Sequence, residues 1–203
     1  FGSFDCSTIG NIPAMPATVA ALRTAPYNMT IGNTSCGTIR FTASDNPAPN
    51  TCAPTTQSVT RTITVWDDLG SPGNNVRDPG ESFVTCTYTY TIVPDNAAPT
   101  LGGCPSNLTL ECDGNYATEI TNWLNAATTA IAGASTDACD NALTVTNNYV
   151  AGTLPALSCN QSTGLSVVFT VTDDCGNNSQ CTRTIIIDDN AAPTIVSCPS
   201  NQT

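Results

Sequence analysis

The chain of 203 residues has no histidine and no lysine, and its only cationic side chains are five arginines. Without histidine it lacks the commonest general base, the base of Ser-His and Cys-His nucleophile pairs, and the usual zinc ligand besides cysteine. Sixteen acidic residues give a net charge of −11, which argues against a nucleic-acid or anionic-membrane surface. We therefore expect no enzymatic activity and no nucleic-acid partner, with cations as the better partners.

Long hydrophobic runs are also missing. The apolar residues make up 40% of the chain but are too dispersed for a membrane span, so we expect a soluble chain that could bury two modest cores. No charged segment followed by an apolar one opens the sequence. Either Phe1 follows a removed signal peptide or the sequence begins inside a longer protein.

Cys-x-x-Cys is absent, although there are eleven cysteines. This spacing suits an oxidised, extracellular disulfide framework better than zinc or redox chemistry, and it predicts a secreted or cell-surface protein. Glycosylation sequons fit an exposed secreted surface, but a chain rich in Asn, Ser and Thr also produces them by chance. The sequons begin at Asn28, Asn33, Asn107, Asn160, Asn177 and Asn201.

One stretch occurs twice, with a shift of 94 residues, which is about the length of a small β-sandwich domain. Each copy reads Asp-Asn-Ala-Ala-Pro-Thr, at 95–100 and 189–194, and is followed by Cys-Pro-Ser-Asn. Ala-Ala-Pro disfavours a helix, so each copy resembles a hinge before a first strand. The repeat predicts a first module at 1–95, a second at 96–189, and the opening of a third at 190–203.

Between these hinges the sequence alternates apolar and threonine-rich polar positions, as half-buried strands do. The stretch 118–129 has the spacing of a short amphipathic helix instead, and 17–24 is a short helical candidate. We therefore predict an all-β fold of tandem immunoglobulin-like antiparallel β-sandwiches braced by disulfides, with one short helix inserted per module. The expected strands lie at 38–43, 59–66, 83–92, 108–112, 143–145, 165–171 and 181–187.

Four ordered segments of the second module, at 104–112, 136–141, 169–177 and 181–194, resemble hyalin-repeat (HYR) domains. They are still more similar to the cysteine-rich variants in giant surface proteins of gliding and biofilm-forming bacteria. The resemblance covers nearly all of 96–203 and implies an immunoglobulin-like fold that works in adhesion or extracellular architecture, without catalysis. The first module departs from the pattern, because Leu69 stands where the second has Cys175.

The resemblance also implies a disulfide between Cys104 and Cys181, which would join the first and last strands. Six cysteines allow 15 connectivities, so the other pairings stay open. The economical remainder is Cys112–Cys139 and Cys159–Cys175. In the first module, Cys6–Cys36 would match Cys112–Cys139 by alignment, and Cys52–Cys86 would pair because both lack the partners of their counterparts. Cys198 would be unpaired or bonded outside its own module.

Acidic residues gather in the expected turns and hinges, and calcium takes six to eight oxygen ligands from such loops. Asp-Asn-Ala-Ala-Pro also resembles the calcium-binding linker of cadherins. The alternative is that Asp and Asn only form turns and keep the surface soluble, with Asp137 and Asp140 in one more such loop. The candidate calcium ligands are Asp67, Asp68, Asp78, Glu81, Asp95, Asp173, Asp174, Asp188 and Asp189.

The aromatic residues Trp66, Trp123, Tyr88 and Tyr90 could form a sugar-binding platform, but their spacing favours core packing. An adhesin that recognises a glycan or host surface, with or without calcium, is thus the alternative function. The function we expect is a non-enzymatic structural protein, either a subunit or a repeat segment of an extracellular filament.

The two ends of the chain predict how such a filament would assemble. The first module reaches Cys6 without an opening strand, whereas 192–203 is an opening strand without a module behind it. We expect this strand to complete the first module of the next copy by β-augmentation, head to tail, in an arrangement that never closes. In a longer polypeptide the same strand would instead connect in cis. The assembly-strand residues are Pro193, Ile195, Cys198 and Pro199.

Overall fold

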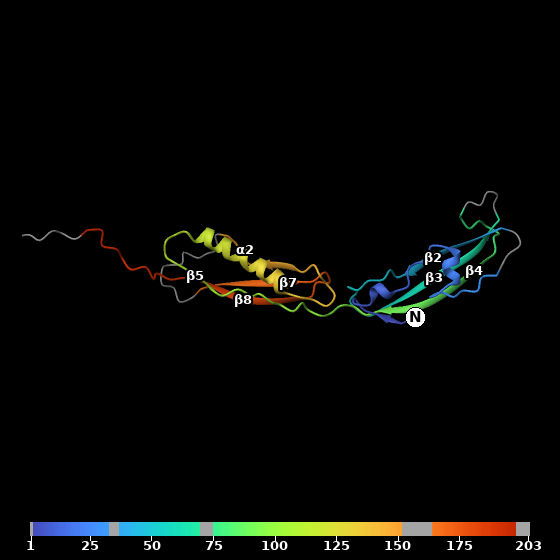
Figure 1. Cartoon of the computed structure of the whole chain (residues 1–203), viewed down its shortest axis with the longest axis horizontal. Helices are drawn as coiled ribbons and strands as arrows, with labels where there is room; N and C mark the ends of the chain where they lie inside the picture. The colour runs from blue at the N-terminus through green and yellow to red at the C-terminus, as the bar shows by residue number, and fades with distance from the viewer. Residues whose placement is uncertain (1, 33–36, 70–74, 152–163, 198–203) are drawn as a thin grey trace, which may run out of the picture. The chain divides into compact units, whose positions relative to one another are not determined.

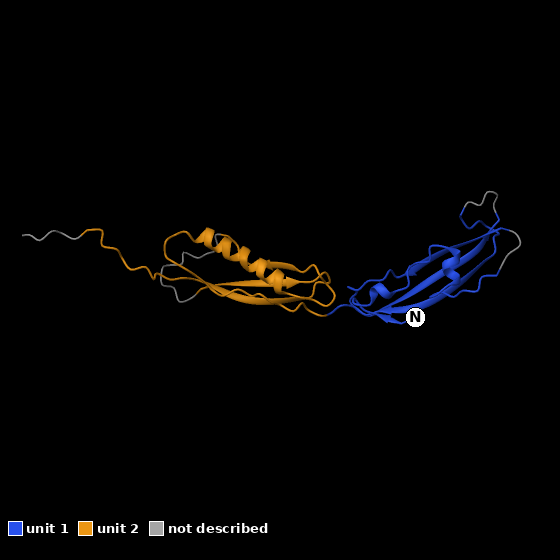
Figure 2. Ribbon diagram, viewed as in Figure 1, with its two compact units in different colours: residues 1–96 blue, residues 97–203 orange. Residues whose placement is uncertain are grey.

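The computed structural model describes residues 2–32, 37–69, 75–151 and 164–197. The chain divides into two compact units, 1–96 and 97–203 (Figure 2), and this division lies one residue from the boundary that the repeat predicts. Several expected sites lie outside the described residues: Asn33, Cys36, Cys159, Asn160, Cys198, Pro199 and Asn201.

Unit 1 contains one four-stranded sheet in the order β1-β4-β3-β2 (Figure 1). Its strands are β1 (Ser3–Phe4), β2 (Thr38–Asn46), β3 (Gln57–Asp68) and β4 (Phe83–Ile92). The last three form an antiparallel meander, while β1 runs parallel to β4. The alternation predicted for β3 is present, because every second residue from Val59 to Val65 is buried.

The expected helix of unit 1 is present as α1 (Val19–Arg23), and a 3-10 turn, η1 (Ile9–Asn11), precedes it. The hydroxyl of Thr18 caps α1 by accepting a hydrogen bond from the Ala21 N–H at 3.1 Å. The helix thereby places Leu22 fully buried against Ile63 and Val65. A second buried cluster joins Val59, Tyr90 and Ile92 at the other end of the sheet.

Unit 2 has a matching sheet in the order β5-β8-β7-β6, with β5 parallel to β8 and the other pairs antiparallel. Its strands are β5 (Leu108–Leu110), β6 (Thr144–Asn147), β7 (Leu165–Thr172) and β8 (Asn178–Ile187). The helix α2 (Tyr116–Ala134) lies along one face of this sheet (Figure 1), where Ile120 and Ile131 share a core with Phe169 and Ile185.

The helix α2 is longer than the expected 118–129. Ile120, Ala127 and Ile131 are buried at helical spacing, so the apolar face continues past the predicted end. The helix ends at Ala134 and is capped by Ser135, whose N–H donates to the Ile131 carbonyl at 2.9 Å. In the described part of the chain, no helix has both the length and the hydropathy needed to cross a membrane.

The fold is therefore mostly strands in two sheets with little helix. It is not fully antiparallel as expected, because the first strand of each unit runs parallel to the last strand. Each unit contributes one sheet among the described residues, and in unit 2 it is α2 that covers its apolar face. The two-sheet sandwich and its immunoglobulin-like topology stay predictions.

A disulfide joins Cys104 to Cys181, the pair that the hyalin-repeat resemblance implies, with Cα atoms 6.6 Å apart. It links the segment before β5 to the middle of β8. Disulfide bonds are also formed by Cys6, Cys52, Cys112, Cys139 and Cys175.

The expected Cys52–Cys86 disulfide is wrong, because Cys86 is a free, exposed thiol. Cys52 lies in the turn before β3, at the end of the sheet where the Asp95 N–H donates to the Thr51 carbonyl. Cys86 pairs with Ile63 in the middle of β3. Six residues of strand, or roughly 20 Å at about 3.3 Å per residue, separate Cys86 from the end of β4, whereas bridged Cα atoms lie within about 7 Å.

Candidate functional site

In unit 2 the outer edge of β8 is covered by the segment that leads into β5. The Asp188 N–H donates to the Leu110 carbonyl at 2.9 Å. Further back along the strand, the Thr184 N–H donates to the side-chain oxygen of Asn107 at 3.1 Å. The segment thus satisfies backbone donors that a bare strand edge would leave open.

The residues before β5 in the same segment also contact the first half of β8. The hydroxyl of Ser179 donates to the Pro99 carbonyl at 2.6 Å, and the Cys104–Cys181 disulfide fixes the segment between these points. Residues 99–110 therefore follow β8 along almost its whole length.

Two glycines let this segment pass close to α2. A Cβ atom added to Gly102 would collide with the carbonyl oxygen of Ala134, and one added to Gly103 would collide with the carbonyl oxygen of Ala130. Gly103 also has a φ of +67°, which side-chain-bearing residues rarely adopt. The path of the segment in unit 2 therefore requires glycine at both positions.

In unit 1 the corresponding strand is only two residues long. β1 pairs Ser3 with Thr91 and Phe4 with Ile92, and the Val93 N–H donates to the Phe4 carbonyl at 2.7 Å. This last bond repeats the bond between Asp188 and Leu110 in unit 2.

The shared pairing sets the correspondence between the two strands. Cys86 lies six residues before the end of β4, and Cys181 lies six residues before the end of β8. By the same count Val84 corresponds to Ser179. Cys86 is thus the counterpart of a cysteine that is disulfide-bonded in unit 2.

Among the residues that the structure describes, the outer edge of β4 is open from Phe83 to Tyr90. No strand among the described residues pairs with it on that side. Since alternate N–H groups of a strand share a direction, those of Thr85, Thr87 and Thr89 face the same edge as the Thr91 N–H, which donates to the Gly2 carbonyl just before β1. An open row of backbone donors and acceptors is a template for pairing with another extended segment.

An apolar groove lies beside this open edge, with a volume of about 600 Å³. Phe83 and Val84 are exposed in it to 56% and 65%, and the thiol of Cys86 is exposed there too. Val84 and Cys86 lie opposite Val65 and Ile63, so they belong to the core face of the sheet. Side chains that line the groove include Met29, Ile31, Ile39, Val65, Trp66 and Phe83.

The groove wall also contains unpaired polar atoms. Trp66 is only 4% exposed, and its indole N–H has no hydrogen-bond partner among the described residues. One carboxylate oxygen of Asp67 is also buried without a partner there. A buried unsatisfied group costs about 1–3 kcal/mol, so a segment that brings polar backbone atoms into the groove would recover part of this cost.

A buried charged network lies in the core of unit 1, and the sequence analysis did not identify it. Arg61 is 3% exposed and binds Asp45 through two hydrogen bonds of 2.7 Å. The Tyr90 hydroxyl donates to the same carboxylate at 2.8 Å, while Arg61 also donates to the Tyr27 hydroxyl at 2.9 Å and to the Pro13 carbonyl. The available signal was an arginine at an inward-facing position of β3.

This network stabilises the charges of the ion pair and keeps the phenols neutral. The hydrogen bond from Arg61 lowers the pKa of Asp45. Burial raises the pKa of Tyr90 to about 12, with a further contribution from its hydrogen bond to Asp45, and burial also raises the pKa of Tyr88. Neither phenol is therefore suited to general acid–base work near neutral pH.

The four candidate platform aromatics do not form one surface. Tyr90 is buried in unit 1 with Tyr88 packed beside it, and Trp123 meets Phe169 edge to face at 5.4 Å within the core of unit 2. Trp66 alone among them lines the groove.

The predicted calcium ligands of the Asp67–Glu81 hairpin serve mainly as hydrogen-bond acceptors. The Glu81 carboxylate accepts from the N–H groups of Leu69 and Asp78, both at 2.8 Å, and closes the loop. Asp68 is buried and forms an ion pair with Arg40 at 3.4 Å. Among the described residues, no three carboxylates bring their oxygens within 4.8 Å of one another.

The acidic turns of unit 2 follow the same pattern. Asp173 accepts from the N–H groups of Cys175 and Asn177, at 3.0 and 2.8 Å. Asp140 accepts from the N–H groups of Ala142 and Asp174, at 2.7 and 2.9 Å. These contacts are those of turn-forming carboxylates, and calcium binding stays a prediction.

Three more acidic residues, Asp137 in a turn and Asp188 and Asp189 in the second hinge, also accept hydrogen bonds from nearby groups. Asp137 accepts from the Cys139 N–H at 2.7 Å, Asp188 accepts from the Asn190 amide at 3.3 Å, and Asp189 accepts from the Ala191 N–H at 3.2 Å. Each is a short-range contact that a turn of Asp and Asn makes by itself.

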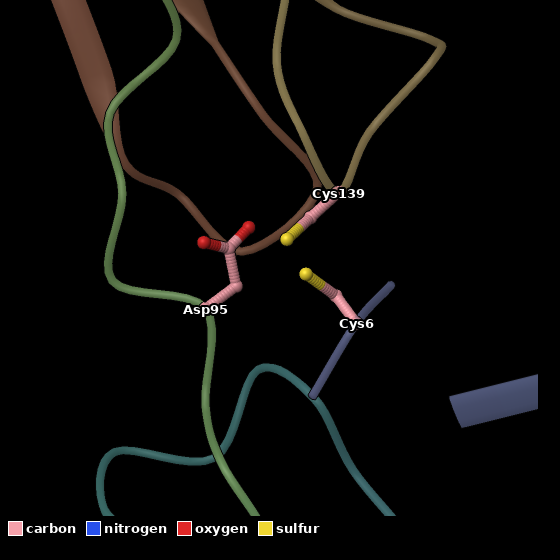
Figure 3. A group of neighbouring side chains, drawn as sticks. All are labelled: Cys6, Asp95 and Cys139. Atoms are coloured by element: carbon pink, nitrogen blue, oxygen red, sulfur yellow. The ribbon is translucent and has the colours of Figure 1, made fainter. Parts of the chain in front are cut away.

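Asp95 lies beside a cysteine of its own unit. Its carboxylate is within 4.8 Å of the sulfur of Cys6 (Figure 3). Cys6 is disulfide-bonded, and so is Cys139 of unit 2, which Figure 3 also labels. A disulfide sulfur is not a thiolate ligand, so Cys6 does not form a metal centre with Asp95.

Of the described sequons, two have asparagine side chains in structural hydrogen bonds. The Asn177 amide donates to Asp173 at 2.8 Å, and Asn107 accepts from Thr184. Asn28 is exposed. Glycosylation of Asn177 would replace a donor that the acidic turn uses, so Asn28 is the more accessible of these acceptors.

Comparison of the chain with models of protein families and with curated proteins finds no match. The structure thus defines the molecule by its own features: two β-rich units with disulfide-bonded cysteines, and an open strand edge beside an apolar groove in unit 1. The hyalin-repeat resemblance stays a prediction.

Proposed function

We propose that the protein is a non-enzymatic, extracellular structural protein that assembles head to tail into a surface filament. Residues 192–203 of one copy would occupy the groove and the open β4 edge in unit 1 of the next copy. The observation that carries this proposal is the difference between the two units: residues 99–110 cover β8 in unit 2, whereas the matching edge of β4 is open.

The sequence of the donor segment supports this assignment. Residues 192–203 repeat 98–109, with Cys-Pro-Ser-Asn at the same place in both segments. The described part of the segment belongs to no helix or strand, and Ile195 and Val196 are exposed to 80% and 96%. Adjacent apolar side chains with this exposure gain most from an apolar groove, at roughly 25 cal/mol for each Å² buried.

Unit 2 provides the template for the paired register. By the correspondence above, Asn201 matches Asn107, which accepts from Thr184. Thr89 is the counterpart of Thr184, so Asn201 of the donor would accept from the Thr89 N–H. The donor would then cover the β4 edge as far as Thr89, because Gln202 and Thr203 match Leu108 and Thr109, whose places in unit 1 are held by Gly2 and Ser3.

The donor segment differs from residues 98–109 at two positions that make it fit unit 1 better than unit 2. Val196 and Ser197 stand where unit 2 has Gly102 and Gly103. A side chain at either glycine collides with the backbone of α2. In unit 1 the groove leaves about 600 Å³ at this edge, lined by side chains such as Met29 and Ile31. Val196 adds apolar surface that suits this lining.

The remaining features agree with an extracellular filament. Disulfide-bonded cysteines are typical of oxidising compartments, and a strongly acidic surface keeps single chains apart until a specific contact forms. A head-to-tail contact uses two different surfaces, so it does not close into a dimer and grows an open filament. The immunoglobulin-like and hyalin-repeat character of the units is part of this proposal.

The test compares full-length chains with one altered side chain. Val196→Asp brings a charge into the apolar groove, so we expect filaments seen by negative-stain electron microscopy to be lost. Val150→Asp is the matched control, because Val150 is an exposed valine, at 60%, outside the segment. We also expect hydrogen exchange of residues 83–90 to slow when filaments form. Normal filaments from Val196→Asp, or unchanged exchange in β4, would contradict the proposal.

The adhesin alternative uses the same groove, where Trp66 has its unpaired indole N–H. A glycan array probed with the Val196→Asp chain, whose groove would be vacant, separates the two functions. Specific glycan binding that the wild-type filament lacks would support an adhesive role for free ends.

A further inference from the structure

We propose that each joint of the filament is closed by a disulfide between Cys198 of one copy and Cys86 of the next. This inference rests on the proposed head-to-tail assembly and adds a covalent bond to it. It also assigns a role to the free cysteine, which the alignment of cysteines alone placed in a pair with Cys52.

The correspondence between the units identifies the two partners. Cys86 occupies in β4 the position that Cys181 occupies in β8. Cys198 occupies in the donor segment the position of Cys104, five residues after the shared Pro of Ala-Ala-Pro-Thr. Cys104 and Cys181 form a disulfide with a Cα separation of 6.6 Å. A donor bound in the same register would place Cys198 and Cys86 at a comparable separation.

The state and surroundings of Cys86 agree with this role. Its thiol is free and exposed and lines the groove, so a reagent or partner can reach it. Cys6 and Cys52 of the same unit are disulfide-bonded. An oxidising environment in which Cys6 and Cys52 each form a disulfide leaves Cys86 reduced only until a thiol reaches it in a suitable geometry.

The chemistry requires an electron acceptor, and we assign it to a small-molecule disulfide of the glutathione class. The Cys86 thiolate attacks this disulfide, forms a mixed disulfide and releases one small thiol. The Cys198 thiolate then attacks the Cys86 sulfur and releases the second. Two protein thiols and one small disulfide give one protein disulfide and two small thiols, so atoms and electrons balance.

The same positions explain why the bond would form late. Before assembly, Cys86 has no thiol partner among the described residues. Docking of the donor raises the local concentration of Cys198 to that of an intramolecular partner. The disulfide would therefore form only after docking, and only when the donor segment pairs with β4 in the register described above.

The test is electrophoresis in denaturant without reductant, after filaments grown with oxidised glutathione are alkylated. We expect wild-type chains to give a ladder in steps of one chain, which collapses to monomer on reduction. Cys86→Ser and Cys198→Ser should each abolish the ladder. The Cys86 side chain is exposed, so the Cys86→Ser variant should fold normally. Peptic digestion of the wild-type ladder should yield a disulfide-linked peptide that joins Cys86 to Cys198.

A shifted thiol is the matched control. Cys86→Ser combined with Thr87→Cys keeps one free thiol on β4 but moves it to the opposite face of the sheet, because successive side chains of a strand alternate. This variant should give no ladder while still forming filaments.

The possible results separate the covalent bond from the assembly itself. Wild-type filaments without a ladder would overturn the disulfide and leave head-to-tail assembly intact. A ladder that persists in Cys86→Ser, or a peptide that joins Cys36 to Cys86 within one chain, would also overturn it. Loss of both filaments and ladder in the wild type would overturn the proposed function together with this inference.

Discussion

Replacing Asp45 by alanine should be the most damaging single change in unit 1. The carboxylate accepts two hydrogen bonds of 2.7 Å from Arg61 and one of 2.8 Å from Tyr90. The side chains of Arg61 and Asp45 are only 3% and 8% exposed. In Asp45→Ala the buried guanidinium keeps only the Pro13 carbonyl and the Tyr27 hydroxyl as partners.

The cost follows from the asymmetry of buried ion pairs. Removing one partner leaves an uncompensated buried charge, which typically costs about 3–5 kcal/mol, whereas replacing both by apolar groups is close to neutral. We therefore expect Asp45→Ala to lower the free energy of unfolding of unit 1 by about 3–5 kcal/mol. The double variant Asp45→Leu and Arg61→Met should recover most of this loss.

Urea unfolding followed by hydrogen exchange of β3 peptides measures unit 1 separately from unit 2. Asp113→Ala removes an exposed carboxylate from unit 2 and should leave the β3 transition unchanged. A loss below about 1 kcal/mol in Asp45→Ala would show that the pair behaves as a surface salt bridge, and the reasoning from burial would be refuted.

Acid provides a second measurement on the same pair. Because Arg61 lowers the pKa of Asp45 in the folded chain, the carboxylate contributes stability above its ordinary pKa of about 3.9. This contribution is lost as the pH falls through the lowered pKa of the folded state. The difference between wild type and Asp45→Ala should therefore shrink below about pH 4, and a difference that grows there would contradict the assignment.

Two further changes test other features. Gly103→Val should speed hydrogen exchange in 99–107 and lower the melting temperature of unit 2, because its Cβ collides with the backbone of α2. Gly133→Ala, a glycine of α2 with open space around it, should stabilise α2 by about 0.5–1 kcal/mol, and equal effects of the two would contradict the steric argument. Calcium, if it binds the acidic loops, should raise the melting midpoint relative to chelator by mass action, and an unchanged midpoint would leave them as ordinary turns.

Local patterns predicted the elements of this fold well. The alternation around Ile63 placed β3, because side-chain direction in a strand depends only on the parity of the position. Ile120 was expected on a helix from its spacing and Leu22 lies in the short helical candidate 17–24, and both are fully buried. The end of α2 was missed, since Ile131 continues the apolar face after a run of threonine and alanine that gives no signal of its own.

Features that depend on register were not predicted. Asp45 and Arg61 become partners only because β2 and β3 pair them directly, and no local pattern contains that register. The status of Cys86 was missed for a similar reason. Counting cysteines paired it with Cys52, whereas the distance along β4 forbids the bond.

The two glycines that pass α2 also govern what one chain can do to itself. Assembly by strand exchange stops when a donor segment binds within its own chain, because that segment can no longer bind the next copy. Here the donor cannot displace residues 98–109 of its own unit 2, because Val196 in the place of Gly102 would meet the Ala134 carbonyl. In the proposed filament, the donor segment of each chain would therefore stay out of the β8 edge of its own unit 2 and would stay available to the next copy.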